Sequence, residues 1–177
     1  MKDYSEHLLD APRKGKSKRL RPAALVIVPL AAILFQTYVT RFSDHLAYLE
    51  LPLLVTLHFA LSGHHPIRSV FYGAAIGLTQ DSLSHQPIGL FGIVKTLVGY
   101  FASSVSSRFD VENPLISFVL CLFFYFFHEF FYWVLQRALL GQAVGFNLQQ
   151  TGIYGLLNAA VAVPLFKLLD KLKVAAE

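Results

Sequence analysis

The spacing of its apolar runs constrains this chain more than any other feature. Long hydrophobic stretches follow one another with only short polar breaks, and each approaches the ~20 residues that a helix needs to cross a bilayer. The chain is 55% hydrophobic and 15% charged, with a mean hydropathy of +0.52, which soluble domains rarely reach. We therefore expect an all-α membrane protein, a bundle of six transmembrane helices at about Pro22–Val39, Leu46–Leu61, Ser69–Leu83, Gly89–Ser106, Leu115–Leu139 and Thr151–Leu169.

The distribution of Lys and Arg predicts the orientation of these helices. Basic residues crowd the segment before the first run and the segment after the last, and Arg68 and Arg108 fall in breaks on the same side. Because positive charge favours the cytoplasmic side, we expect a multi-pass protein of the bacterial inner membrane with both termini in the cytoplasm. The first run is too long for a signal-peptide core and lacks a convincing cleavage site, so we expect it to be retained.

Composition also predicts the domain organisation and excludes some partners. Residues 1–20 are polar and basic, which predicts a disordered cytoplasmic tail that contacts anionic lipid, and residues 21–172 form the bundle. The formal net charge is +4, but the basic residues lie near the termini rather than along one surface. This distribution favours membrane lipids over nucleic acid as partners.

The segment from Gly73 to Tyr100 carries an acid and a base within apolar helices. Asp81 lies near the end of the first helix and Lys95 lies inside the second. A charge near the bilayer centre costs roughly 3 kcal/mol, so both need a partner. Their depths agree within about one helical turn, which makes a salt bridge or water-bridged pair available. Such a pair either fixes the helix register or forms a polar pocket.

Glycine and proline residues lie within the same segment as Asp81 and Lys95. Gly73 and Gly77 share a helix face with Asp81 and form a small-xxx-small pattern that lets another backbone approach closely. That approach is either packing inside the bundle or a homodimer or partner interface. Pro87 and Gly89 fit a tight hairpin that begins the next helix.

Two later spans carry further polar candidates. Glu129 lies among aromatic residues and shares a face with Tyr125 and Tyr132, so we expect it to face the bundle interior. Asn158 precedes Pro164 in the last span, where we expect a local break or kink with Asn158 satisfying the freed backbone groups.

The sequence offers little support for catalysis or for a cofactor. The histidines His58, His64 and His65 suggest a metal, but adjacent histidines point about 100° apart on a helix and no Cys or carboxylate is near in sequence. There is no phosphate-binding loop, dinucleotide fingerprint or H-E-x-x-H motif. We expect no enzymatic activity, no metal and no cofactor.

The order of these motifs resembles a known family. The run Gly73-x3-Gly77-x3-Asp81-Ser82, then Pro87-Ile88-Gly89 and Gly99-Tyr100, is similar to the rod shape-determining protein MreD family, and the last span YGLLNAAVAVPLFKLLDKL resembles its closing helix. The family usually opens the second span with Pro followed by Asp or Asn, whereas Leu53 follows Pro52 here. Its fold is similar to the substrate-binding subunits of vitamin-uptake (ECF-type) transporters.

The resemblance implies a non-enzymatic scaffold of the bacterial cell-elongation (rod) complex, the elongasome. Such proteins bind MreC, and they act alongside the MreB cytoskeleton and the glycan polymerase–transpeptidase pair of peptidoglycan synthesis to maintain cell shape. Binding to a second copy of the chain is a further expectation. The alternative is a small-molecule-binding membrane subunit of a vitamin-uptake transporter, with a pocket on the extracytoplasmic side.

Overall fold

The structure, a computed structural model, describes residues 18–20, 22–39, 48–63, 65–84 and 87–175. This part of the chain forms the helices and strands β1 (Lys18–Leu20), α1 (Pro22–Val39), α2 (Leu51–Gly63), α3 (Pro66–Leu83), α4 (Leu90–Ser106), α5 (Pro114–Leu140), α6 (Leu148–Asp170) and β2 (Lys173–Ala175). Each apolar run of the sequence therefore overlaps one helix. Residues 1–17 of the expected tail lie outside the described residues.

Residue types at the helix ends explain where α5 and α6 begin and end. The Asn113 side chain accepts a hydrogen bond from the backbone N–H of Leu115, and Pro114 occupies the first helical position. Gly141 ends α5 with a positive φ of 62°, which glycine adopts without strain. The Asn147 side chain caps α6 by accepting a hydrogen bond from the Gln150 N–H. α6 continues through Pro164, so of the expected break or kink the break is wrong.

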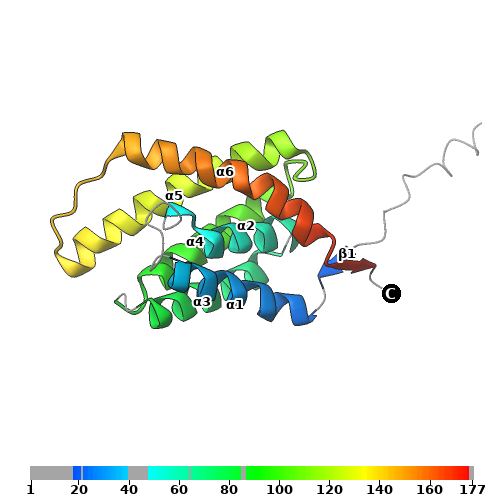
Figure 1. Cartoon of the computed structure of the whole chain (residues 1–177), viewed down its shortest axis with the longest axis horizontal. Coiled ribbons are helices and arrows are strands. Elements are labelled where there is room, and N and C mark those ends of the chain that lie inside the picture. The colour runs from blue at the N-terminus through cyan, green and yellow to red at the C-terminus, as the bar shows by residue number, and fades with distance from the viewer. Residues whose placement is uncertain (1–17, 21, 40–47, 64, 85–86, 176–177) are drawn as a thin grey trace, which may run out of the picture.

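Helix α2 is the centre of the bundle (Figure 1). It has 13 residues, and every one from Pro52 to Leu61 is buried. At 1.5 Å per residue it is about 20 Å long, shorter than the ~30 Å hydrocarbon core. Because the other helices surround it, α2 buries its apolar surface within the protein instead of exposing it to lipid.

Two short strands modify the expectation of an all-α chain. β1 pairs antiparallel with β2, with Lys18 opposite Ala175 and Leu20 opposite Lys173. Residues 18–20 therefore form a strand where the sequence predicts the end of a disordered tail. The pairing brings the start of α1 and the end of α6 to the same end of the molecule (Figure 1).

The outer surface of the bundle is strongly apolar. Two helices, α5 and α6, are long and apolar enough to cross a membrane, and α1, α2 and α4 contain shorter apolar helical segments. Large apolar side chains are exposed along the outside, among them Val26, Ile67, Phe71, Leu115, Phe123 and Ile153. Soluble monomers rarely expose apolar surface on this scale, so the surface and the helices indicate a membrane protein.

Candidate functional site

Asp81 caps the start of the neighbouring helix. Its carboxylate accepts hydrogen bonds from the backbone N–H groups of Gly89 (2.8 Å), Phe91 (3.1 Å) and Gly92 (3.1 Å). These are donors that a helix N-terminus leaves without intrahelical partners, and a negative charge at this position also interacts favourably with the helix dipole. Asp81 is buried, so the α3–α4 hairpin is held together from inside.

Gly89 and Pro87 lie in the described part of the turn between α3 and α4. Gly89 has a φ of +108°, which a residue with a Cβ rarely adopts. Pro87 contributes its carbonyl to the backbone N–H of Leu90 at 3.5 Å. The left-handed glycine turns the chain so that the first N–H groups of α4 face Asp81.

Glycines bring the backbones of α3 and α4 into direct contact. A Cβ at Gly73 would clash with the Lys95 carbonyl, and one at Gly77 would clash with the Phe91 carbonyl. Gly99, on α4, lies in the same way against the Ser69 carbonyl of α3. The two predicted glycines therefore face a helix of their own chain, and Gly99 extends the contact by about one turn.

Lys95 is fully buried, and its ion-pair partner is Glu50 rather than Asp81. The Nζ atom lies 3.8 Å from Glu50 Oε2, 3.4 Å from His128 Nε2 and 4.4 Å from the centroid of the Phe91 ring. The predicted Asp81–Lys95 salt bridge does not form in the structure, because both Asp81 oxygens are occupied by the N–H groups of α4.

Glu129 continues this polar contact from α5. Its Oε1 lies 3.3 Å from His128 Nδ1. If the Lys95 ammonium donates to His128 Nε2, the other ring nitrogen carries the proton and donates to Glu129. One chain of polar contacts thus links Glu50 on one side to Glu129 on the other, through Lys95 and His128.

Asn158 is buried and holds the segment that leads into α2. Its side-chain oxygen accepts from the Glu50 N–H at 2.9 Å, and its amide group donates to the Tyr48 carbonyl at 2.8 Å. A second donation, to the Tyr154 carbonyl at 2.9 Å, stays within α6. The sequence predicts that Asn158 satisfies backbone groups freed near Pro164, whereas two of its three hydrogen bonds go to residues over one hundred positions earlier.

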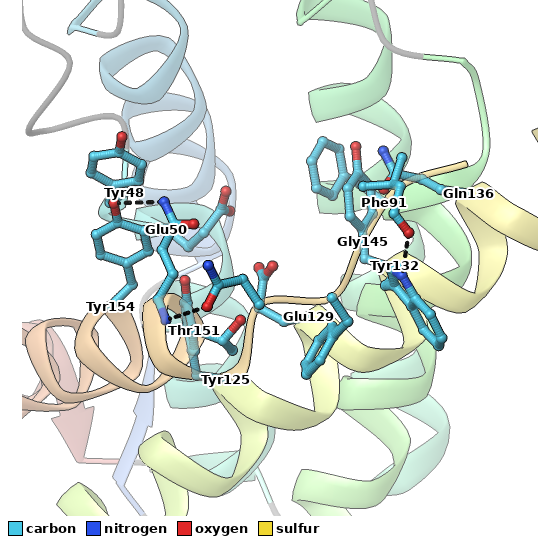
Figure 2. A pocket seen from close by; sticks show the side chains of 15 residues that line it. Tyr48, Glu50, Phe91, Tyr125, Glu129, Tyr132, Gln136, Gly145, Thr151 and Tyr154 are labelled. Atoms are coloured by element: carbon cyan, nitrogen blue, oxygen red, sulfur yellow. Dashed lines mark hydrogen bonds between the residues drawn. The ribbon is translucent and has the colours of Figure 1, made fainter. Parts of the chain in front are cut away.

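A cavity of about 350 Å³ lies next to this polar chain, between α4, α5, α6, the α5–α6 loop and the segment that precedes α2. Figure 2 shows Tyr48, Glu50 and Tyr154 on one side, Phe91 and Tyr132 on the other, and Glu129 between them. The Tyr48 and Tyr154 rings stack with centroids 3.8 Å apart, and the Phe91 and Tyr132 rings with centroids 4.8 Å apart. The wall is therefore largely aromatic, with two carboxylates.

The α5–α6 loop closes one side of the cavity. Trp133 Nε1 donates a hydrogen bond to the Val144 carbonyl at 2.8 Å, and its ring contacts Phe146. Gly145 and Phe146 line the cavity together with Trp133. The loop is thus attached to α5 by the contacts of Trp133 with Val144 and Phe146.

Sequence reasoning missed two members of this site. Glu50 belongs to it as the partner of Lys95, and His128 as the link to Glu129. Glu50 lies directly before an apolar helix, and a search for an acid at the matching depth on any span would have found it beside Asp81. His58, a candidate metal ligand in the sequence, instead pairs with Asp170 at 2.9 Å. No group of three potential metal-binding side chains gathers within the described residues.

The fold and site define a class of protein: a helical membrane bundle with buried charges paired between helices and a polar–aromatic cavity at one end. The family model for rod shape-determining protein MreD matches residues 17–173, so the chain belongs to the MreD family and to the proteins that determine rod shape. Comparison with curated proteins and with solved structures gave no match. Proteins of that family are structural components that determine cell shape.

Proposed function

We propose that this protein crosses the inner membrane six times with both termini in the cytoplasm. The β1–β2 pairing supports this topology, because an even number of crossings brings the two ends to one side. Arg68, Arg108 and Lys167 lie near that same end of the helices, as cytoplasmic residues do. The short α2 fits because it is surrounded by the other helices.

Impermeant thiol labelling tests the topology directly. Cys121 is the chain's only cysteine and is buried, so it gives little background. We expect Ile88→Cys, in the exposed α3–α4 hairpin, to react in intact spheroplasts. Glu112→Cys, in the exposed α4–α5 turn, should react only after permeabilisation. Reaction of both positions from outside would contradict the topology.

In function, the protein acts as a non-enzymatic subunit of the cell-elongation complex that binds MreC and helps couple the MreB cytoskeleton to peptidoglycan synthesis. The family membership carries this proposal. The apolar outer face supports it, since exposed side chains such as Phe71 and Phe123 offer surface for a partner's transmembrane helix. Because lipid provides no hydrophobic driving force between helices, such association depends on close van der Waals packing and on polar contacts.

Two experiments test this function. Affinity purification in mild detergent should recover MreC in amounts comparable to the bait, and deletion of the gene should turn rod-shaped cells round. Cells that keep their rod shape, with no second copy of the gene, would argue strongly against the proposal. A matched mock purification from the deletion strain controls for non-specific recovery.

The cavity favours a second candidate function, a small-molecule-binding subunit similar to those of vitamin-uptake transporters. In the proposed topology it opens on the extracytoplasmic side, where a transported substrate would enter. Mass spectrometry of the purified protein separates the two candidates. A stoichiometric small molecule with no bitopic partner would favour the binder, and a partner with no ligand would favour the scaffold.

A further inference from the structure

The walls of the cavity have a charge that nothing in the cavity balances. Glu50 and Glu129 line it, and no lysine or arginine is among its lining residues, all of which the structure describes. The nearest buried cation is Lys95, which lies behind the wall and pairs with Glu50. Two carboxylates against one ammonium leave a formal charge of −1 at the wall, where the Glu50 and Glu129 side chains are 17% and 29% exposed and bulk water screens them only in part.

The other nearby charges do not remove this excess. Asp81 accepts hydrogen bonds from three backbone N–H groups at the start of α4, which stabilise its charge and supply no cation to the cavity. Arg137 is exposed, and its guanidinium lies 5.3 Å from the centroid of the Trp133 ring without lining the cavity, so solvent screens it. Glu50 Oε2 is buried and faces Lys95 Nζ at 3.8 Å. Glu129, whose side chain is 29% exposed, is the carboxylate that remains open to the cavity.

The aromatic residues define the kind of cation. Their ring faces attract cations through the quadrupole, most strongly for organic groups that shed water easily. Aromatic walls supply no ligands for a hard metal ion, which prefers several oxygens. Tyr132 and Tyr154 add hydroxyl groups, which can accept hydrogen bonds, to the lining. The wall therefore suits a group with N–H donors on an apolar stem.

We propose that the cavity binds an organic ammonium or guanidinium group, which forms an ion pair with Glu129 and lies against the Tyr132 and Trp133 rings. The proposal goes beyond the function in cell elongation and does not depend on it. The group belongs either to a free small amine or to a basic side chain of a peptide. Both sources present the same chemistry to the two carboxylates.

The only tryptophan of the chain reports on this cavity. Trp133 lines it, so its fluorescence should change when a ligand enters. The probes are propylammonium, n-propanol of the same length, and propionate, titrated into the full-length protein in nanodiscs. We expect a saturable change with propylammonium and at least about tenfold weaker binding of propanol and propionate.

Charge-neutral variants identify the carboxylates involved. Glu129→Gln should weaken propylammonium binding by about tenfold or more, whereas Glu112→Gln, which changes an exposed carboxylate on the far side, should leave it unchanged. An unaltered Trp133 emission maximum and melting temperature in Glu129→Gln show that the variant is folded. If the variant melts early, Glu129→Asp replaces it, and partial binding is then expected.

The source of the cation is determined with a second pair of probes. Nα-acetyl-lysine amide binding more tightly than propylammonium indicates a peptide side chain, and weaker binding indicates a free amine. Equal binding of propylammonium and propanol, preference for propionate, or full affinity in folded Glu129→Gln would overturn the proposal.

Discussion

Replacing Asp81 by Asn should destabilise the bundle, although the two side chains have nearly the same shape. Asp81 Oδ2 accepts from Gly89 and Gly92, and Oδ1 accepts from Phe91. Asn keeps one oxygen and turns an NH₂ group toward the remaining N–H donor, so at least one donor of α4 loses its acceptor.

The structure gives the size of the expected effect. A buried donor left unsatisfied costs about 1–3 kcal/mol, and the lost interaction of a carboxylate with the helix N-terminus adds about 1 kcal/mol. Removing a buried anion also relieves part of its desolvation cost, which acts in the opposite direction. We therefore expect Asp81→Asn to lose about 2–3 kcal/mol of unfolding free energy, and Asp81→Leu, which leaves all three N–H groups without an acceptor, to lose more.

The assay is reversible unfolding by SDS in mixed micelles, followed by Trp133 fluorescence and by circular dichroism. Asp110→Asn is the matched control, because Asp110 is exposed and its Oδ1 accepts only one local hydrogen bond, from Glu112. The control should stay within about 0.5 kcal/mol of the unchanged protein. An Asp81→Asn protein as stable as that control would refute the capping role.

Three further substitutions have defined outcomes in the same unfolding assay. Gly77→Ala should lose about 2 kcal/mol or more because its Cβ meets the rigid α4 backbone, whereas Gly145→Ala has open space and should change stability by less than about 0.5 kcal/mol. Lys95→Met should lose about 2–3 kcal/mol by leaving Glu50, whose side chain is 17% exposed, without its partner, and adding Glu50→Gln should restore part of the loss; no restoration would argue against the pair. Asn158→Leu should lose about 2–4 kcal/mol through two unsatisfied backbone groups, and a loss below 1 kcal/mol would contradict this role.

Helix positions followed from the sequence because hydrophobic length is a local property. The first predicted span, Pro22–Val39, has the bounds of α1, and the fourth differs from α4 by one residue. The second predicted span starts at Leu46, but α2 begins at Leu51. Asn158 binds backbone groups at residues 48 and 50 just before this helix, a long-range contact that apolarity cannot indicate.

Partners of buried charges were harder to predict because the nearest acid in sequence is not the nearest in space. Asp81 is 14 positions from Lys95 and Glu50 is 45, so local reasoning favoured Asp81. It overlooked that a helix start presents N–H donors which compete for a carboxylate. Once α4 begins at Leu90, those donors take Asp81 and leave Lys95 for an acid from another helix.

The helix pairs α2–α6 and α3–α4 are each held together by different contacts, and Lys95 connects the two pairs. Helix α6 holds α2 at two places, through Asn158 at the Glu50 segment just before it and through Asp170 at His58 within it. Helices α3 and α4 are joined by glycine contacts and by Asp81. Lys95, on α4, reaches Glu50 at the start of α2 and His128 on α5. Because Glu50 also lines the cavity, the contact that joins the two pairs sets the position of one cavity wall, so bundle stability and cavity shape depend on the same buried charge.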